Sequence, residues 1–169
     1  MTPQRLDRVL KSYRIGDPKG AHAIFDATAS TAYPGRWNTP TSPLLYTSEH
    51  YSTALLEKLV HANGILPPDQ HFIEIIIASG TTYEVLDEAA LPDWASPTAA
   101  ASKAFGEAWQ QSGRSLLLIV PSVVARPDRN FLFNPQHEQF GTLQPSLHRP
   151  VWWDRRLFAA AEVRPSRLP

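Results

Sequence analysis

The chain has no cysteine among its 169 residues. Disulfides, thiolate zinc sites and cysteine nucleophiles are therefore excluded, because each needs a sulfhydryl sulfur. The chain also lacks net charge, since 16 basic and 16 acidic residues balance. That balance argues against general attraction to nucleic acid or to an anionic membrane surface. It leaves association with another protein open, and equally a homodimer within a larger complex.

Long hydrophobic runs are missing as well. No run approaches the roughly 20 residues of a membrane-spanning helix. The segment from Met1 to Arg8 lacks the apolar stretch of a secretory signal peptide, so we expect a cytoplasmic protein. The Gly-rich dinucleotide fingerprint, the Gly-x-Ser-x-Gly nucleophile motif and the phosphate loop ending in Gly-Lys-Ser/Thr are all absent. The six histidines show no metal-binding spacing.

The chain does have enough hydrophobic sequence for one domain with a core, at 43% hydrophobic and 19% charged residues. Its 16 prolines divide it into short elements. We predict helices at residues 1–12, 49–61 (with Ser48 as N-cap) and 98–111, and strands at 13–15, 44–47, 72–78, 83–86, 115–120, 131–133 and 151–158. Helices and strands do not alternate strictly. We therefore expect an α+β or mixed α/β single domain over 1–169, with short-stranded central sheets flanked by helices.

The strongest functional signal is the run Tyr33-Pro34-Gly35-Arg36-Trp37-Asn38, followed by Tyr46 and then by Glu57 on a helical pattern. A glycine lets the backbone approach a ligand closely, and an arginine grips phosphate with a planar fork. An aromatic ring stacks on a flat base, and a carboxylate stabilises a developing cation. Together these residue types suit a dinucleotide with two phosphates, a base and a reactive sugar.

Each of these residues also has a structural interpretation. Arg14, in a predicted strand, suits either an exposed edge position or a phosphate clamp. Arg36 either stacks on Trp37 and bonds backbone carbonyls or binds a ligand. Tyr46, taken singly, fits a core position.

The remaining candidates are ambiguous in the same way. Glu57 lies off the apolar stripe around Leu55 and Leu59, so periodicity favours a solvated carboxylate. Ser122 follows the end of a buried strand, where it either caps a turn or reaches a cleft. For Asn130 the pattern favours a turn position.

Several motifs occur in a fixed order between about residues 13 and 158: Tyr13-Arg14, Gly35 to Asn38, Tyr46, Ala54 to His61, Val120 to Ser122, Asn130 to His137 and Asp154 to Phe158. In this order they resemble the RES-domain toxins, a family named for its arginine, glutamate and serine positions. Residue by residue, the resemblance makes Arg14 and Arg36 the two arginines, Tyr46 the tyrosine, Glu57 the acidic residue and Ser122 the serine.

The resemblance implies a fold like that of ADP-ribosyltransferases and an enzyme that depletes NAD⁺. Such an enzyme cleaves the nicotinamide–ribose bond, with phosphate or water as acceptor. NAD⁺ is then a substrate, and neither a cofactor nor a metal is needed. The resemblance also implies an Xre-type antitoxin that binds DNA and blocks the active site. Two alternatives stay open: an ADP-ribosyltransferase that modifies a protein, and a non-catalytic nucleotide- or partner-binding module.

The implied chemistry assigns a task to each residue type. The arginines neutralise the pyrophosphate, Tyr46 stacks on nicotinamide, Glu57 stabilises the oxocarbenium ion, and Ser122 orients the amide or the acceptor. We expect NAD⁺ to contact Arg14, Gly35, Arg36, Trp37, Asn38, Tyr46 and Ser122. The pair Trp152-Trp153 either packs in the core, which we favour, or contributes to an antitoxin interface.

Overall fold

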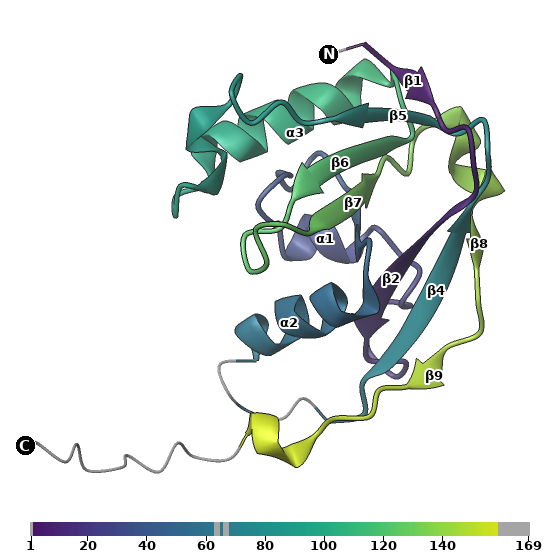
Figure 1. Cartoon of the computed structure of the whole chain (residues 1–169), viewed down its shortest axis with the longest axis vertical. Helices are drawn as coiled ribbons and strands as arrows, with labels where there is room; N and C mark the ends of the chain where they lie inside the picture. The colour runs from purple at the N-terminus through teal and green to yellow at the C-terminus, as the bar shows by residue number, and fades with distance from the viewer. Residues whose placement is uncertain (1, 63–64, 66–67, 159–169) are drawn as a thin grey trace, which may run out of the picture.

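A nine-stranded, strongly curled sheet forms the centre of the computed structural model (Figure 1), which describes residues 2–62, 65 and 68–158. The strands are β1 (Gln4–Arg5), β2 (Leu10–Gly16), β3 (Leu45–Ser48), β4 (His71–Ile77), β5 (Thr82–Val85), β6 (Leu117–Pro121), β7 (Arg129–Phe133), β8 (Gln144–Pro145) and β9 (Arg149–Pro150). Their order is β1-β5-β6-β7-β3-β2-β4-β8, with β9 also paired to β4. β5 and β6 run parallel, and the other described pairs are antiparallel.

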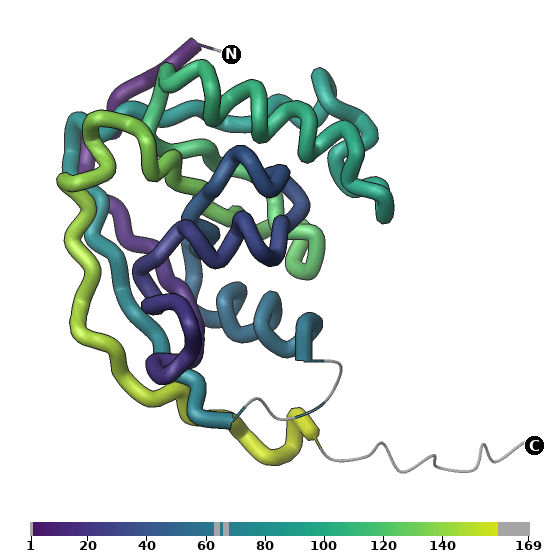
Figure 2. The backbone as a smooth tube through the Cα atoms, turned by 180° about the vertical axis from the view of Figure 1, so that it is seen from behind, coloured from purple at the N-terminus to yellow at the C-terminus, as the bar shows by residue number. Residues whose placement is uncertain are grey.

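Helices flank this sheet at both ends. They are α1 (Ala29–Ala32), α2 (Tyr51–His61) and α3 (Ala100–Ser112), with 3₁₀ turns at Pro92–Ala95, Glu138–Thr142 and Arg155–Leu157. α3 lies beside β5 at one end of the molecule, and α2 lies beside β2 at the other (Figure 1). Seen from behind, the segment that connects β2 to β3 crosses between these two ends (Figure 2). The expected mixed α/β domain of short strands and flanking helices is confirmed.

The sheet opens between β2 and β3. Seven residue pairs join β2 to β4, and four join β3 to β7. In contrast, a single pair, Tyr13 opposite Ser48, joins β2 to β3. The two strands therefore diverge, and backbone groups along the opening need partners other than a strand ladder.

Alternating burial explains why the strongest predicted strands form. In β4, Ile73, Ile75 and Ile77 point to one face and are buried in a hydrophobic cluster. This is the period of two that a half-buried strand requires. A second cluster holds Trp37, Trp94 and Trp109 together with residues of β6 and β7.

α3 packs tightly on the second cluster. At Gly106 an added Cβ would lie 1.8 Å from the carbonyl oxygen of Trp37, so only glycine permits this approach. The predicted helix at 98–111 is confirmed as α3, and Gly113 ends it in the left-handed conformation with φ of 59°. This contact fixes the loop that contains Gly35 and Arg36 against the helix.

The predicted lead-in helix at residues 1–12 is wrong. The segment is extended, with Leu6 exchanging backbone hydrogen bonds with Gly80 and Thr81. Leu6 is buried, whereas Val9 is exposed. Three apolar residues at helical spacing are too few to outweigh the pairing of this segment with the sheet.

Two further element predictions are also wrong. Ser48 ends β3 instead of capping a helix, and α2 begins at Tyr51 with His50 at its N-cap. Residues 151–158 form no strand, and Trp152 is 79% exposed, so it does not pack in the core. The predicted helix stop at Asn63-Gly64 lies outside the described residues.

Candidate active site

A cavity of about 840 Å³ lies at the opening between β2 and β3, with α2 and the start of α3 as further walls. This volume is typical of ligand sites, which run from about 300 to 1,000 Å³. Six of the predicted site residues line it: Arg14, Gly35, Arg36, Trp37, Tyr46 and Glu57. Ser122 and Asn38 are fully buried and lie behind the wall.

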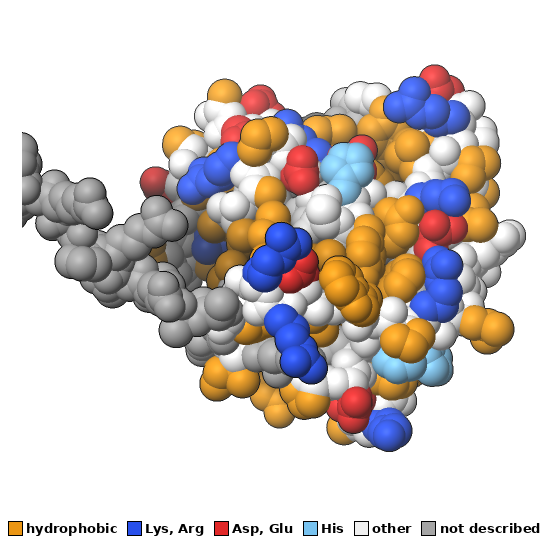
Figure 3. All heavy atoms as spheres, turned by 60° about the horizontal axis from the view of Figure 1, so that its bottom comes forward, with side chains coloured by type: hydrophobic (Ala, Val, Ile, Leu, Met, Phe, Trp, Pro, Cys, Tyr) orange, Lys and Arg blue, Asp and Glu red, His pale blue; other side chains and the backbone are white. Residues whose placement is uncertain are grey.

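The lining is more basic than the rest of the chain. Among the described residues it contains four positive side chains and one carboxylate: Arg14, Arg36, Lys58, Lys103 and Glu57. On the face drawn in Figure 3, in contrast, acidic and basic side chains are interspersed. A concave site with an excess of one charge attracts the opposite charge, here an anion such as a pyrophosphate.

Arg14 lies on β2 and reaches across the opening of the sheet. Its Nη1 donates to the carbonyl oxygen of Tyr46 at 2.8 Å, and its Nη2 donates to that of Asp26 at 3.4 Å. Its Nε is buried without a partner among the described residues. Burial lowers the pKa of Arg14 to about 10, so the side chain stays charged at neutral pH. Because carbonyls hold this guanidinium, its charge remains available to a ligand.

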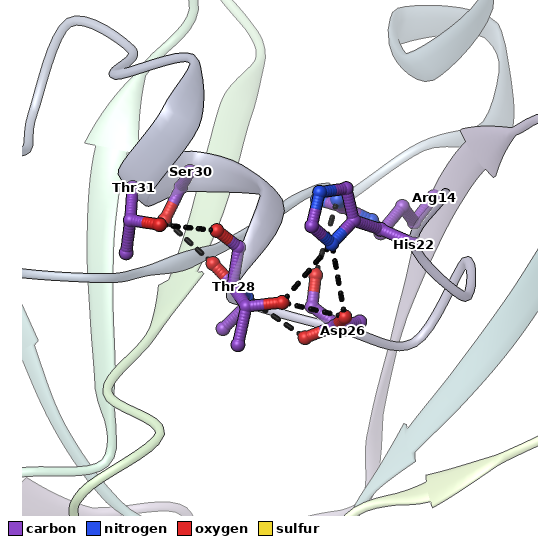
Figure 4. A network of polar contacts seen from close by, with 7 residues as sticks. Arg14, His22, Asp26, Thr28, Ser30 and Thr31 are labelled. Atoms are coloured by element: carbon purple, nitrogen blue, oxygen red, sulfur yellow. Dashed lines mark hydrogen bonds and ion pairs between the residues drawn. The ribbon is translucent and has the colours of Figure 1, made fainter. Parts of the chain in front are cut away.

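The Asp26 loop supports Arg14 from behind (Figure 4). The carboxylate of Asp26 accepts bonds from the Thr28 amide at 2.8 Å and the Thr28 hydroxyl at 2.7 Å. His22 lies 3.4 Å from the same carboxylate. The Thr28 bonds, from hydroxyl and then amide, lower the pKa of Asp26 below its ordinary value. The loop is therefore fixed with the Asp26 carbonyl turned toward Arg14.

Arg36 connects two loops at the cavity wall. Its Nη1 donates to the carbonyl oxygens of Trp94 and Ser96 at 3.0 and 2.7 Å. The structural interpretation, in which Arg36 bonds backbone carbonyls, therefore holds while the side chain still lines the cavity.

Tyr46 and Asn38 organise the loop around Gly35. The Tyr46 hydroxyl donates to Asn38 Oδ1 at 2.9 Å, and the Gly35 amide donates to the same oxygen at 2.7 Å. A Cβ at Gly35 would lie 2.7 Å from the Tyr46 ring, so glycine is required there. Burial raises the pKa of Tyr46, which keeps its phenol neutral.

Trp37 offers little surface for stacking. Its side chain is 3% exposed and packs on Trp94 and Phe105, so it belongs to the core. Trp37 and Asn38 therefore shape the loop from inside, and the rings that line the cavity in more exposed positions are those of Tyr13, Tyr33 and Tyr46.

Glu57 is half-buried and held by side-chain donors, whereas periodicity suggested a fully solvated carboxylate. Its Oε1 accepts from Ser122 Oγ at 2.8 Å and from Asn130 Nδ2 at 2.7 Å. Ser122 Oγ also accepts from the amides of Val124 and Ala125, so it caps a turn and bonds Glu57 at once. The turn-cap interpretation of Ser122 therefore holds, whereas its side chain does not reach the cavity itself but bonds Glu57, which does.

α2 is rotated relative to the apolar stripe read from its sequence. Thr53 and Ala54 are buried, whereas Leu56 and Val60 are 43% and 55% exposed. The Thr53 hydroxyl bonds the carboxylate of Asp128 in the loop after β6. The helix thus turns a polar face inward, and the spacing of Thr53 and Glu57 by four residues was the available signal.

Three further residues of this site were missed. Asn130 lies in β7, not in a turn, and bonds Glu57. Lys58 and Lys103 line the cavity, and burial followed by the charge of Arg14 lowers the pKa of Lys58. Nothing in the sequence distinguishes these two lysines from solvated ones, because their position depends on how the helices dock.

Two negative findings apply to the part of the chain that the structure describes. None of its helices is both long enough and apolar enough to span a membrane. No cluster of three or more histidine, aspartate or glutamate side chains is arranged to hold a metal ion.

Known proteins resemble this chain in sequence and in fold. The RES domain model matches residues 11–154. A protein of Sphingobium sp. (strain YBL2), named "Prs ADP-ribosylating toxin", is 33% identical over 159 residues, covering 89% of this chain and 92% of its own length. A "Toxin Res" of Photorhabdus laumondii is 30% identical over 131 residues, covering 76% and 83%.

A solved structure shares the fold. It is a chain of the M. tuberculosis MbcT–MbcA toxin–antitoxin complex, with a TM-score of 0.68. The match covers 87% of this chain and 86% of that one, at 13% sequence identity. At that identity the likeness concerns architecture alone.

Proposed function

This chain belongs to the RES domain family, and we propose that it is the toxin of a toxin–antitoxin system that degrades NAD⁺. The observation that carries the proposal is the convergence of Arg14, Arg36 and Glu57, from three separate segments, on one cavity. A cavity with an excess of positive charge and a single held carboxylate suits a pyrophosphate attached to a reactive ribose.

The reaction breaks the bond between ribose C1′ and the nicotinamide nitrogen. The bonding electrons go to the pyridine ring, which leaves as neutral nicotinamide, so a strong general acid is not required. Positive charge then develops on C1′ and the ring oxygen, where the Glu57 carboxylate stabilises it. An oxygen of phosphate or water bonds to C1′ and releases its proton to solvent. NAD⁺ is the substrate, and the proposed reaction uses no metal and no added cofactor.

Arg14 and Arg36 bind the pyrophosphate in this proposal, with Lys58 and Lys103 adding positive charge. Tyr46 forms a wall for a flat ring. Ser122 is fully buried behind Glu57, so its proposed task is to hold that carboxylate and not to touch the substrate.

A protein antitoxin is the proposed partner. The neighbour of the same fold was solved within a toxin–antitoxin complex. Near the cavity, Tyr33 is 82% exposed and Val60 is exposed as well, which suits coverage by another protein. With zero net charge on this chain, contact with DNA falls to the partner. The proposed site of action is the cytoplasm, where NAD⁺ is present.

Protein modification is the second candidate. The observation that favours it is the name of the Sphingobium relative, an ADP-ribosylating toxin at 33% identity. The same cavity would bind NAD⁺, and a nucleophilic side chain of a target protein would replace phosphate or water at C1′.

One experiment separates these candidates. Purified chain, freed of any partner, is incubated with NAD⁺ with and without phosphate, and the products are identified by mass spectrometry. Free ADP-ribose or its phosphate supports NAD⁺ degradation. A covalent ADP-ribose adduct on an added protein extract supports the second candidate. A chain that consumes no NAD⁺, yet gains thermal stability from it, is a binding module.

A further inference from the structure

Asn130 is the second donor to Glu57. It is not one of the arginine, glutamate and serine positions for which the family is named. Its Nδ2 lies 2.7 Å from Glu57 Oε1. Ser48 Oγ in turn donates to Asn130 Oδ1 at 2.8 Å. The contacts form a continuous path from the end of β3, through β7, to the carboxylate on α2.

The strand register produces this path. Ser48 and Asn130 face each other directly in the β3–β7 pair, so their side chains stand side by side. Both residues line the cavity, and Ser48 is buried. The placement follows from the sheet itself and needs no flexible loop.

The Glu57 carboxylate can only accept, so it requires the NH₂ group of Asn130, and the Ser48 hydroxyl holds the other end of the amide by donating to Oδ1. An amide can rotate by half a turn and exchange its oxygen with its nitrogen. With Oδ1 occupied by the Ser48 hydrogen bond, the NH₂ group is the part that faces Glu57. Without Ser48, Asn130 Oδ1 loses this donor and the amide is held at the Glu57 end alone.

Both donors use the same oxygen of Glu57. Ser122 and Asn130 bond Oε1, which leaves Oε2 without a protein donor among the described residues. Two bonds to one oxygen fix the rotation of the carboxylate plane. The free oxygen is then the one available to a ribose hydroxyl or to a developing positive charge.

We propose that Asn130 is a positioning residue for Glu57, and that Ser48 holds the Asn130 amide in place through Oδ1. The inference rests on the proposed function, because its kinetic tests measure NAD⁺ consumption. It goes beyond that function by assigning to two residues of the sheet the task of presenting Glu57 Oε2 to the substrate.

The main test is Asn130→Asp, which keeps the shape and the Ser48 contact but replaces the NH₂ donor by a second carboxylate. At high pH the two carboxylates repel, and kcat is expected to fall about 10²-fold with KM nearly unchanged. At lower pH the two groups share one proton, which restores a hydrogen bond to Glu57. The ratio of variant to wild-type kcat should therefore rise from about pH 8 to about pH 5.

Charged groups around this pair are the same in variant and wild type. Arg14, Arg36, Lys58, His61 and Lys103 line the same cavity, and Asp128 lies in the adjoining loop. Because these groups are present in both proteins, the ratio of variant to wild-type kcat removes the part of the pH dependence that the two proteins share. A loss of kcat that is equal at every pH would overturn the proposal, because a merely structural asparagine predicts that result.

Asn134→Asp is the matched control. Asn134 is also buried at the end of β7 and also donates through Nδ2, but to the carbonyl oxygen of Gln110, away from the cavity. Its change should lower the melting temperature without a pH-dependent kcat ratio. If this control shows the same rise at low pH, the effect is not specific to Asn130.

Ser48→Ala tests the contact to Asn130 Oδ1. We expect a fall in kcat of about 10-fold, and little further loss when it is added to Asn130→Ala, because both changes act through the same carboxylate. If the losses of kcat in Ser48→Ala and Asn130→Ala add up in the double variant, the two residues act independently, which contradicts the proposal. Side-chain amide signals of Asn130, followed by ¹H–¹⁵N NMR, should also shift in Ser48→Ala whether or not the protein is active.

Failure of the proposed function gives a different pattern. If wild type consumes no NAD⁺ with any acceptor, the proposed function falls, and the NMR comparison still decides whether Ser48 holds the Asn130 amide. If wild type is active and Asn130→Asp matches it at every pH, this inference alone falls.

Discussion

The two sides of the cavity hold their charged groups by different means. Arg14 is bonded to the carbonyl oxygens of Tyr46 and Asp26, which belong to the backbone. Glu57 is bonded to the side chains of Ser122 and Asn130. In both cases a neutral partner fixes a charge without cancelling it, so the charge can act on a ligand.

The two sides of the cavity differ in which substitutions they tolerate. Carbonyl partners persist through most side-chain substitutions, so the Arg14 side depends mainly on the arginine itself and on the loop that carries Asp26. Side-chain partners are lost one mutation at a time, so the Glu57 side depends on three or more separate residues. Substitutions on each side of the cavity test this contrast.

Glu57→Gln should reduce NAD⁺ consumption by at least about 10²–10³-fold, because the variant removes the negative charge that stabilises the developing cation. The measurement is the steady-state rate at saturating NAD⁺. Glu107→Gln is the matched control, since Glu107 accepts bonds from Thr39 and Thr41 outside the cavity lining. Retained activity in Glu57→Gln would count against the mechanism.

Arg14→Lys should raise KM about 10-fold, equivalent to about 1.4 kcal/mol of binding. An ammonium group cannot reproduce the planar fork that reaches two carbonyls and a phosphate together. Arg5→Lys is the control, because Arg5 also donates to a backbone carbonyl, that of Gly80, but away from the cavity. An unchanged KM in Arg14→Lys would mean that Arg14 serves the fold alone.

Gly35→Ala should destabilise the protein by about 1–3 kcal/mol, because the new methyl group meets the ring of Tyr46. KM should rise too, since the displaced loop also carries Arg36. Gly141→Ala is the comparison, because its Cβ would enter open space. Urea unfolding of both variants measures the difference, and equal midpoints would show that the Gly35 loop relaxes freely.

Asp26→Asn should have the smallest effect, under about 1 kcal/mol, because solvent screens this partly exposed carboxylate. Folding lowers the pKa of Asp26, so folding favours its ionised form. That contribution is complete above the ordinary aspartate pKa of about 3.9 and is lost as pH falls through the lower pKa of the folded state.

The check is urea unfolding of wild type and Asp26→Asn at about pH 7 and about pH 3. The difference in stability between them should shrink at the lower pH. A difference that grows on acidification would contradict the assignment of the pKa shift.

Local patterns were sufficient for the strands and helices whose own residues carry a clear period. β4 alternates buried isoleucines, and α3 ends at a glycine in the left-handed conformation, so both were predictable. The lead-in helix at 1–12 and the strand at 151–158 were wrong, because so few apolar residues cannot show whether a segment pairs with the sheet. The order of chemistry-bearing residues along the chain was also sufficient to suggest Arg14, Arg36, Tyr46 and Glu57 as a set.

Local sequence patterns are thus enough to predict which residues form the site and most of the elements that carry them. Long-range packing sets which face of α2 turns inward, where β2 and β3 part, and that Ser48 and Asn130 stand opposite each other behind Glu57. Those outcomes depend on contacts between segments far apart in the chain, and a short-range period of 2 or 3.6 residues carries no information about them.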